Sequence, residues 1–368
     1  MKIHWLSPED EAWRAHLSNV PHDIYHRPEY VCIEAELAAG TAVAILAEEE
    51  NRSLFLPLIL RQIPNSRSLD ATSPNGYPGP LLSVPDEDNA FAKARFAADA
   101  TGEILQQLRD VKIVSAFIRC HPFLTDGVAG IQLHGTTVEH GNTVFIDLDQ
   151  SEETLWGQTR ASHRSEINQS KRKGFETTID EDWNGLDDFV SMYYETMQRV
   201  SASDNYFFPP NYFATLRDQL AEYTFLCITR HEGVPASGGI FTKCHEIVQY
   251  HLGATASAFV AQHPSKQLLD FARRRAKQDG CRKMHLGGGV NCQRDSLLNF
   301  KRGFSKLSAN FMTCRLIADQ PAYRLLVESW QAEHRSLADD AQGFFPAYRK
   351  PASAISSTFT RPPRPIAA

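Results

Sequence analysis

The chain has 368 residues, of which 42% are hydrophobic and 22% charged, enough apolar material for one large domain or two smaller ones. Its formal net charge of −6 excludes a protein covered in positive charge for nonspecific binding to duplex nucleic acid, and leaves a local basic patch open. Its longest apolar runs, 42–47 and 54–60, are too short to cross a bilayer, and the first residues lack the apolar core of a signal peptide.

The seven cysteines are scattered along the chain and contain no Cys-x-x-Cys pair. This pattern favours reduced thiols over a disulfide framework or a zinc knuckle. The sequence also shows no Ser-His-Asp order, no phosphate-binding P-loop and no metal-ligand spacing. We therefore expect a cytoplasmic protein with no membrane span and no metal site.

Two stretches of the chain repeat one plan at a spacing of roughly 180 residues. Each begins with a hairpin whose second strand is almost continuously apolar, and continues through a helix to another strand. The first has strands at 42–47 and 54–60, a helix at about 91–109 and a strand at 112–118; the second has strands at 224–229 and 236–242, a helix at 266–278 and a strand at 283–286. The repeat predicts a mixed α/β fold in which one unit occurs twice.

The remaining segments join and close these two units. The predicted elements are a strand at 143–148, helices at 153–173 and 186–200, a strand at 308–317 and a helix at 321–333. Residues 340–368 contain several prolines among serines and threonines. We expect a loosely held tail there.

The helix predicted at 266–278 is preceded by the residues Gln262-His263-Pro264-Ser265. Ser265 or a neighbour can cap this helix, and the backbone N–H groups at its start can hold an anion such as a phosphate. An ordinary capped helix explains the same residues. His263 and Ser265 are therefore candidate ligand-binding residues by position alone.

A run of three glycines, Gly287-Gly288-Gly289, follows the strand at 283–286. Glycine lets the backbone turn sharply or approach a ligand closely, whereas a strand end by itself needs no such run. Farther along, Phe300-Lys301-Arg302-Gly303 places two cations before a glycine. Cations at the C-terminus of a helix are a common stabilising feature, so this second segment alone does not establish a site.

Two further segments have unusual compositions. Residues 156–173 carry one acid, Glu166, and a net charge of +4 from five cations, Arg160, Arg164, Lys171, Arg172 and Lys173. They form a candidate surface for RNA phosphates or another anion, and a solvated helix face is the alternative. Five of the nine residues at 205–213 are aromatic, so this segment either lines an acceptor cleft or fills core.

Four motifs occur in an order that is specific when they are taken together. Near the start stands Tyr25-His26-Arg27-Pro28-Glu29-Tyr30, followed by Gly76-Tyr77-Pro78-Gly79-Pro80. The basic helix contains Arg164, Ile167, Ser170, Lys173 and Gly174, and the last motif joins Leu286-Gly287-Gly288-Gly289 to Phe300-Lys301-Arg302-Gly303-Phe304. In this order they resemble the FemABX-like (peptidyltransferase) branch of the GNAT superfamily, and the resemblance covers about residues 23–317.

The resemblance implies two GNAT-like domains in tandem, each a mixed sheet flanked by helices, at 1–150 and 151–307. In the family the final strand and helix commonly return to the first domain, so residues 308–335 would complete it. Known members are cytoplasmic transferases that form an amide with aminoacyl-tRNA as the donor, typically on a peptidoglycan precursor. The resemblance implies no tightly bound cofactor, and it does not fix the small molecule or precursor that supplies the acceptor amine.

Two departures from the family bear on the donor. The coiled-coil insertion that contacts tRNA in some members is absent. Ordinary GNAT acetyltransferases carry Gln/Arg-x-x-Gly-x-Gly/Ala around the pyrophosphate of coenzyme A, and here that place reads Gln262-His263-Pro264-Ser265-Lys266 without either glycine. This difference argues against coenzyme A bound in the usual way.

We therefore expect an aminoacyl-tRNA-dependent aminoacyltransferase that acts on a cell-wall or specialised-metabolite precursor. One alternative is an N-acyltransferase that uses acyl-CoA or an acyl carrier, for example in polysaccharide biosynthesis. Another is a non-catalytic binding protein with the same fold. The oligomeric state and the transferred group do not follow from the sequence.

The resemblance maps the catalytic pair onto Phe300 and Lys301, where the acyl end of the donor enters. A cation there would stabilise the negative oxygen of the tetrahedral intermediate. The neighbouring candidate substrate-binding residues are Gly288, Arg302, His263 and Ser265. The proton acceptor stays open between Asp204, Asp295, a water molecule and the leaving group.

The acceptor cleft is expected between the two halves, because clefts at domain junctions are a usual location for small-ligand sites. Asn75 and Tyr77 would line it from the first half, and Tyr206 and Phe208 from the second. The tRNA or a phosphorylated acceptor would contact Arg160 and Arg164.

Overall fold

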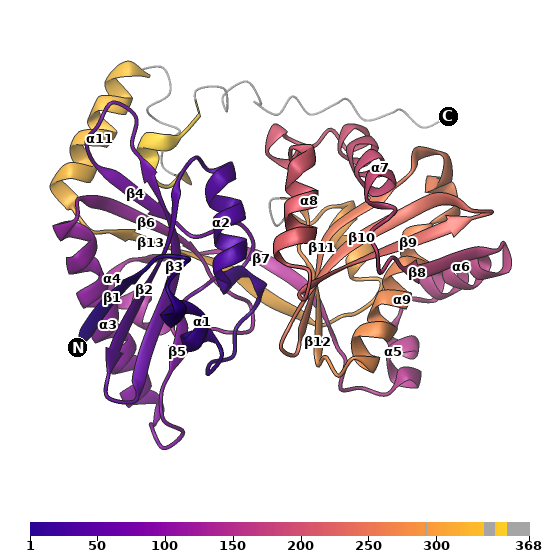
Figure 1. Ribbon diagram of the computed structural model, residues 1–368, viewed down its shortest axis with the longest axis horizontal. Coiled ribbons are helices and arrows are strands. Elements are labelled where there is room, and N and C mark those ends of the chain that lie inside the picture. Colours follow the sequence, from indigo (N-terminus) through magenta and orange to yellow (C-terminus); the bar gives the residue numbers. More distant parts are fainter. Residues whose placement is uncertain (291–292, 335–342, 352–368) are drawn as a thin grey trace, which may run out of the picture.

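The structure is a computed structural model that describes residues 1–290, 293–334 and 343–351 (Figure 1). Within these ranges, twelve strands follow one another across a single mixed sheet, and a thirteenth, β5, pairs with β3. The order across the sheet is β1-β2-β3-β4-β6-β13-β7-β12-β11-β10-β9-β8. Helices cover its faces, which confirms the predicted mixed α/β fold class.

The first half of the molecule comprises β1 (Lys2–Leu6), α1 (Glu11–Leu17), α2 (Pro28–Leu37), β2 (Thr41–Glu49), β3 (Arg52–Gln62), β4 (Leu69–Thr72), β5 (Leu81–Ser83), α3 (Ala90–Asp110), β6 (Ile113–Arg119) and α4 (Val128–His134). A short 3-10 helix at Ile24–His26 precedes α2. Strand β13 (Ser308–Ile317) and helix α11 (Gln320–Glu333) also pack here, because β13 pairs with β6.

The second half comprises α5 (Glu152–Gln158), α6 (Ala161–Arg172), β8 (Phe175–Ile179), α7 (Leu186–Arg199), α8 (Pro210–Gln219), β9 (Thr224–His231), β10 (Val234–Cys244), β11 (Ile247–Thr255), α9 (Pro264–Gln278), β12 (Lys283–Gly287) and α10 (Ser296–Lys301). Short 3-10 helices lie in this half at Asp204–Tyr206 and Ser257–Gln262. Another, Ala347–Arg349, follows α11 and belongs to the first half.

Strand β7 (Thr136–Asp147) joins the two halves (Figure 1). Its first part pairs with β13, and its last residues, from Val144 to Asp147, pair with β12. The predicted strand at 143–148 therefore forms the end of a strand that begins at Thr136. Because both edges of β7 are hydrogen-bonded, the sheets of the two halves form one continuous sheet.

Each half contains the predicted hairpin, which is β2–β3 in the first and β9–β10 in the second. Each hairpin leads to a strand, a long helix and a further strand that lies parallel to the previous one. These parallel pairs are β4 with β6 and β11 with β12. The helices between them, α3 and α9, are the crossover connections that parallel pairing requires.

Helix starts follow from local chemistry. Proline occupies the first helical position of α2, α8 and α9, where its missing N–H would have no partner within the helix. Side-chain oxygens of Asn89, Ser151, Asp295 and Asp319 accept backbone N–H bonds at the starts of α3, α5, α10 and α11. Such caps each stabilise a helix by about 1 kcal/mol.

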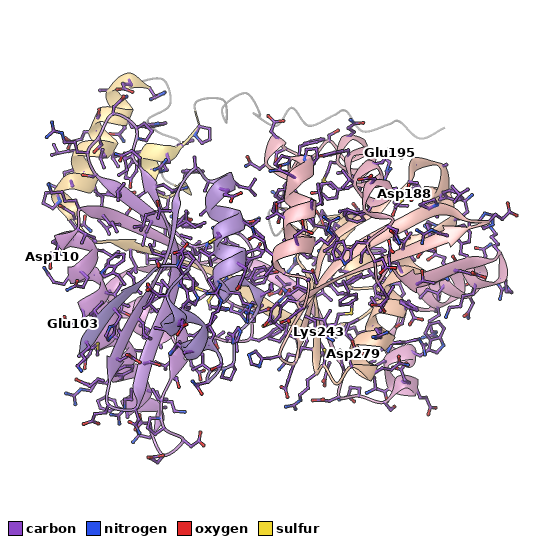
Figure 2. All side chains as sticks on the ribbon, in the orientation of Figure 1. Glu103, Asp110, Asp188, Glu195, Lys243 and Asp279 are labelled. Carbon is purple, nitrogen blue, oxygen red and sulfur yellow. The ribbon has the colours of Figure 1, made fainter. Side chains whose placement is uncertain are left out.

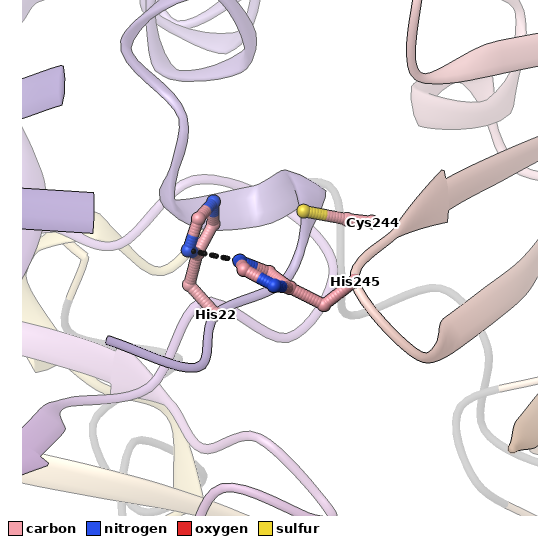
Figure 3. A group of neighbouring side chains, drawn as sticks. All are labelled: His22, Cys244 and His245. Carbon is pink, nitrogen blue, oxygen red and sulfur yellow. Dashed lines mark hydrogen bonds between the residues drawn. The ribbon is translucent and has the colours of Figure 1, made fainter. Parts of the chain in front are cut away.

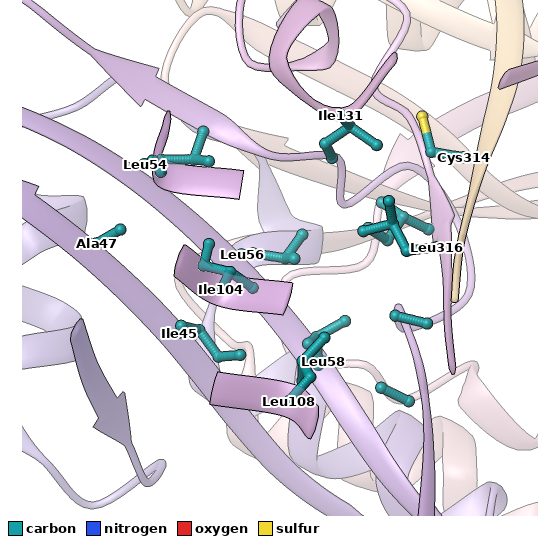
Figure 4. Close-up of a cluster of buried hydrophobic side chains, with 14 of the residues drawn as sticks. Ile45, Ala47, Leu54, Leu56, Leu58, Ile104, Leu108, Ile131, Cys314 and Leu316 are labelled. Carbon is teal, nitrogen blue, oxygen red and sulfur yellow. The ribbon is translucent and has the colours of Figure 1, made fainter. Parts of the chain in front are cut away.

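The core of the first half lies between α3 and the sheet (Figure 4). Leu54, Leu56 and Leu58 of β3 meet Ile104 and Leu108 of α3 there. The outer faces of the helices are polar instead, with acidic side chains such as Glu103 and Asp110 on α3 and Asp188 and Glu195 on α7 (Figure 2). This division into an apolar inner face and a polar outer face is what holds each helix against the sheet.

The helix predicted at 153–173 is wrong in one respect, because it consists of two helices. The chain is extended at Thr159 and Arg160, and the Arg160 N–H donates to the Gly303 oxygen (2.7 Å). The Arg164 guanidinium donates to the carbonyls of Trp156, Gly157 and Thr159 at 3.2, 2.9 and 2.6 Å. It thereby satisfies the exposed carbonyl end of α5.

Part of the tail predicted at 340–368 is packed against the first half. The Tyr348 side chain is buried, and its hydroxyl lies 2.8 Å from the Ser115 hydroxyl. The Arg349 guanidinium bonds to the buried Asp70 carboxylate. Residues 340–342 and 352–368 lie outside the described residues. None of the described helices is long and apolar enough to cross a membrane.

Candidate functional site

Lys301 is the last residue of α10, and its side chain is buried where the two halves meet. Its ammonium donates to the Gly288 carbonyl (2.7 Å). The carboxylate of Asp295 caps α10 through the Leu298 N–H (2.8 Å) and also accepts the Val290 N–H (2.7 Å). The glycine turn and α10 are therefore tied together, and this fixes the position of Lys301.

Gly287 brings two predicted site residues together. Its φ of +77° is in the left-handed region, which favours glycine. A Cβ atom at this position would lie 3.2 Å from the Lys301 Nζ and 3.5 Å from the Tyr77 hydroxyl. Lys301, Tyr77 and Gly288 thus lie at one point, although more than 200 residues separate the first two in sequence.

A buried chain of hydrogen bonds lies beside this point and crosses from one half to the other. The His285 Nδ1 donates to the Gln249 Oε1 (2.7 Å), and the Gln249 amide donates to the Asp23 Oδ2 (2.6 Å). The same carboxylate oxygen lies 3.0 Å from the His121 Nε2. Asp23 and His121 belong to the first half, and Gln249 and His285 to the second. The sequence analysis missed this chain, because its members are far apart in sequence.

Burial and partners set the charges in this chain. Burial alone would raise the pKa of Asp23, but the hydrogen bonds from His121 and Gln249 hold that pKa below its ordinary value. Burial, with smaller contributions from His121 and the positive charge of Lys301, lowers the pKa of His285 to about 3. Near neutral pH the chain therefore holds an ionised carboxylate and a neutral His285 ring.

A cavity of about 920 Å³ opens in the first half, beside the ends of β4 and β6. Its described lining is rich in cations, and Glu333 is the acid among these residues. The cationic lining side chains are Arg61, Arg119, Arg315, Arg349 and Lys350. Asp70, buried beneath the cavity, pairs with Arg61 (3.0 Å) and Arg349. The remaining positive charge makes the cavity suited to an anionic ligand.

Aromatic rings connect this cavity to Lys301. His140 lines the cavity, and its ring centroid lies 5.6 Å from that of Phe311. Phe311 in turn lies 5.4 Å from Tyr77, which stands edge-on to His285 at 4.8 Å. A cavity of this volume holds a drug-sized ligand. Packed rings thus lie between the cationic wall of the cavity and the lysine, and Lys301 itself does not line the cavity.

The structure places the other residues predicted around Lys301 in supporting positions. The Phe300 ring packs between His163 (5.7 Å) and Phe304 (5.5 Å), and its carbonyl accepts a bond from the His163 Nε2 (3.0 Å). Arg302 is exposed at the end of α10. The Arg160 guanidinium donates to the Asn299 side chain (3.1 Å) and thereby braces α10.

The basic segment is therefore different from the predicted surface. Arg160 and Arg164 are held by hydrogen bonds within the protein. Arg160 is nevertheless exposed, and three further exposed cations, Lys171, Arg172 and Lys173, follow at the end of α6. The Lys171 ammonium lies 3.5 Å from the Asp270 carboxylate.

The four residues predicted to line the acceptor cleft occupy two places. Tyr77 and Phe208 both pack against a hydrophobic cluster to which Tyr25, Tyr30 and Tyr212 contribute, and the Phe208 ring stacks on Tyr212 at 4.3 Å. Asn75 is exposed, and its backbone oxygen accepts the Tyr30 hydroxyl. Tyr206 is exposed on the short helix before α8, where its carbonyl accepts the hydroxyl of Tyr193.

The start of α9 differs from the prediction at Ser265. His263, with φ of +56°, precedes the helix, and no side chain caps it. Ser265 is the second helical residue. The carboxylate of Glu166, from α6, bonds to Lys266 and lies 3.5 Å from the His263 Nε2. The start of this helix is therefore occupied by an ion pair between Glu166 and Lys266.

Known proteins resemble the chain in both sequence pattern and fold. Residues 157–302 match the family model of an acetyltransferase (GNAT) domain. The crystal structure of FemX matches with a TM-score of 0.66 at 15% identity, over 88% of this chain and 99% of that one. The C-terminal domain (DUF2156) of a putative lysylphosphatidylglycerol synthetase from Agrobacterium fabrum matches with a TM-score of 0.51 at 13% identity, over 82% and 90%. No curated protein matches the sequence.

These matches confirm the resemblance that the motifs indicated. FemX shares its fold with nearly the whole of this chain, and the matched GNAT domain contains Lys301 and the glycine turn. Residues 157–302 therefore match an acetyltransferase (GNAT) domain, and the chain as a whole has a FemX-like fold.

Proposed function

We propose that the protein transfers an aminoacyl group from an aminoacyl-tRNA to an amine of an anionic precursor. The observation that carries this proposal is the convergence of Lys301, Tyr77 and the glycine turn, which a row of packed aromatic rings joins to a cavity lined by cations. The cavity would hold the anionic part of the acceptor. The lysine would lie where its amine meets the donor ester.

The reaction needs no covalent enzyme intermediate. The acceptor nitrogen attacks the ester carbonyl, a C–N bond forms, and the carbonyl oxygen becomes negative. The ammonium of Lys301 stabilises this oxygen, as a fixed cation does in other acyl transfers. The C–O bond to the ribose then breaks, and the ribose oxygen takes up the proton that the amine loses. Asp295 is an unsuitable base, because both its carboxylate oxygens accept backbone N–H groups.

The lining of the cavity supports an acceptor that carries phosphate or carboxylate groups. The Arg315 guanidinium donates to the Gly343 carbonyl (2.8 Å), and its buried Nε has no partner among the described residues. Arg119 is held against the Phe117 ring and donates to the Ser73 carbonyl (3.0 Å). Guanidinium groups that are positioned in this way recognise planar or tetrahedral anions.

Two features of the second half support tRNA over coenzyme A as the donor. The Glu166 carboxylate, paired with Lys266, lies at the start of α9, where a coenzyme A pyrophosphate would need room and backbone N–H groups. The exposed Lys171, Arg172 and Lys173 offer a contact for RNA phosphates on the same half of the molecule. One fold neighbour is a domain of a putative lysylphosphatidylglycerol synthetase, and the product in this name is an amino acid attached to an anionic lipid. That name agrees with aminoacyl transfer to an anionic acceptor.

An acyl-CoA- or carrier-dependent N-acyltransferase is the second candidate function. The match of residues 157–302 to an acetyltransferase domain favours it. A non-catalytic binding protein would keep the cavity and consume neither donor.

A donor-consumption assay distinguishes these functions. The protein is incubated with a mixture of radiolabelled aminoacyl-tRNAs and an extract of small-molecule amines, with and without ribonuclease, and in parallel with acetyl-CoA. We expect tRNA-dependent, ribonuclease-sensitive formation of a labelled amide that Lys301→Met abolishes. Consumption of acetyl-CoA alone would establish the second candidate, and consumption of neither donor would contradict acyl transfer.

A further inference from the structure

A second cluster of reactive side chains joins the two halves away from Lys301. His22 precedes the short helix at Ile24–His26 in the first half, and Cys244 and His245 form the turn between β10 and β11 in the second. One ligand atom of each residue lies within 4.8 Å of the others. Figure 3 shows the His22 and His245 rings beside each other, with the Cys244 sulfur directed toward them.

The hydrogen bonds of His22 determine which of its nitrogens carries a proton. The Nδ1 lies 3.0 Å from the Val20 carbonyl and 2.9 Å from the His245 Nε2. A carbonyl can only accept, so Nδ1 is the donor, and the lone pair of a neutral ring is then on Nε2. The His245 Nε2 accepts from this N–H, and its lone pair becomes available to a metal when the ring turns away and Nδ1–H keeps the Val20 carbonyl as its acceptor.

One ring nitrogen of His22 forms no hydrogen bond within the described part of the chain. Its Nε2 is buried and has no hydrogen-bond partner among the described residues. A buried polar atom of this kind normally has a partner, and a missing one points to a bound species. The arrangement, with Nδ1–H on a backbone carbonyl and a lone pair on Nε2, is the usual one for a metal-binding histidine.

We propose that His22, Cys244 and His245 bind a divalent transition-metal ion of the Zn²⁺ class. Two imidazoles and one thiolate are ligands that Zn²⁺ and Co²⁺ prefer, and they leave a fourth tetrahedral position for water. On binding, the Cys244 thiol loses its proton to solvent and a metal–sulfur bond forms. The ligand atoms are close enough that small side-chain movements bring them to bonding distance.

The position of this site gives it a structural role. His22 directly precedes Asp23, which is part of the hydrogen-bond chain between the halves. A metal held by ligands from both halves would therefore brace the junction that positions Lys301. The sequence spacing could not reveal the site, because 221 residues stand between His22 and Cys244. That separation is why the sequence alone predicts no metal site.

Cobalt spectroscopy tests the proposal without any assay of activity. Tag-free protein, reduced and freed of metal with a chelator, is titrated with Co²⁺ without oxygen. We expect one equivalent to bind and to produce a near-ultraviolet sulfur-to-cobalt charge-transfer band, which Zn²⁺ then removes, since Zn²⁺ binds such sites more tightly than Co²⁺. The same Zn²⁺ should raise the melting temperature, because it binds the folded chain.

Variants locate the metal. Cys244→Ser should abolish the charge-transfer band, and His245→Ala, at an exposed position, should weaken Co²⁺ binding at least tenfold. Cys32→Ser is the matched control and should leave both the band and the affinity unchanged, because Cys32 lies outside the cluster. Absence of the band in the wild-type protein, or a band that survives in Cys244→Ser, would overturn the proposal. A His22→Ala variant that fails to fold leaves this test intact.

Discussion

The end of the parallel strand pair is open in the first half of the molecule and filled in the second. In each half, pairing of the two parallel strands ends at a defined residue pair, Thr72 with Phe117 in the first and Gln249 with His285 in the second. In the first half, Thr72 and Phe117 line the open cationic cavity. In the second half, Gln249 and His285 are buried; His285 donates to Gln249, and Gln249 donates to Asp23.

The difference shows how a repeated unit acquires two functions. The strand, helix and strand plan creates a gap between diverging strands in both halves. Side chains of the first half, including Asp23 and the rings of Tyr77 and Phe123, fill the gap of the second half. One gap therefore remains for a ligand, and the other holds the two halves in register beside Lys301.

Removal of the Lys301 charge should have the largest effect. Lys301→Met keeps the length of the side chain and deletes the ammonium, so we expect turnover to fall by about 10²–10³, or roughly 3–4 kcal/mol in the barrier. Loss of the bond to Gly288 should lower stability by about 1 kcal/mol. Initial rates and melting temperatures measure the two effects separately.

The exposed neighbour Arg302 provides the control for this variant. Arg302→Met removes an adjacent cation and should change neither quantity appreciably. If Lys301→Met keeps its turnover within a few-fold of wild type while its stability drops, Lys301 only supports α10.

Interruption of the buried hydrogen-bond chain should lower the stability of the protein and leave the cationic cavity unchanged. Gln249→Leu removes the donor to Asp23 and the acceptor of His285, and leaves both buried polar groups without these partners. We expect unfolding free energy to fall by about 2–3 kcal/mol in urea titrations. Thr177→Val is the control, because it deletes a hydroxyl contact with Thr229 on the outer strands. An equal loss in both variants would show that the chain has no special role.

Acid should weaken the second half through His285. Its folded pKa of about 3 lies below the ordinary value of 6.5, so between these pH values the unfolded chain holds the additional proton. Stability therefore falls as the pH falls, by about 1.4 kcal/mol per pH unit for this residue. His285→Gln keeps a donor toward Gln249 and cannot titrate. Urea titrations from pH 6.5 to 4.5 should show a shallower slope in this variant, and an unchanged slope would contradict the assignment.

Loss of one cavity cation should weaken acceptor binding and leave the fold intact. Arg315→Ala should raise the KM for the acceptor about tenfold, which corresponds to about 1.4 kcal/mol, with a small change in kcat. Arg95, exposed on α3 away from the cavity, is the control for overall charge. An Arg315→Ala enzyme with an unchanged KM would place the acceptor elsewhere.

The exposed cations of α6 should have the smallest effect. Replacement of Lys171, Arg172 and Lys173 by alanine should weaken tRNA binding and reduce the slope of log affinity against log salt by about 2. Arg164→Ala should instead lower stability, because that side chain caps α5. Filter binding at several salt concentrations distinguishes the two, and an unchanged slope in the triple variant would exclude this surface from tRNA binding.

The sequence was sufficient for the elements that depend on local pattern. Apolar periodicity located both hairpins and the helices α3 and α9, because each buries one face along its whole length. The motifs also indicated Lys301, Tyr77 and Gly288 as site residues, although they did not place Tyr77 beside Lys301. Ser265 was wrong as a cap, because Pro264 begins the helix one residue earlier and the chain turns at His263.

Features made by long-range contacts could not be predicted in this way. The cavity depends on Arg119, Arg315 and Arg349, which stand on three separate segments and carry no shared motif. The break between α5 and α6 depends on the Gly303 carbonyl, which competes for the Arg160 N–H from more than 140 residues away. Periodicity records which face of an element is buried, and it contains no information about which distant group will meet it.

The continuous hydrogen bonding of β7 has a consequence for the choice of substrate. Strand β7 is bonded to β13 along its first part and to β12 along its last, and the buried hydrogen bond from Gln249 to Asp23 spans the same junction, so a hinge between the halves would have to break that bond. The cationic cavity and Lys301 are therefore held at a constant separation. Under the proposed function, the protein would therefore select acceptors by length. An acceptor reacts when the distance from its anionic group to its amine matches that separation. Shorter or longer analogues bind without reacting.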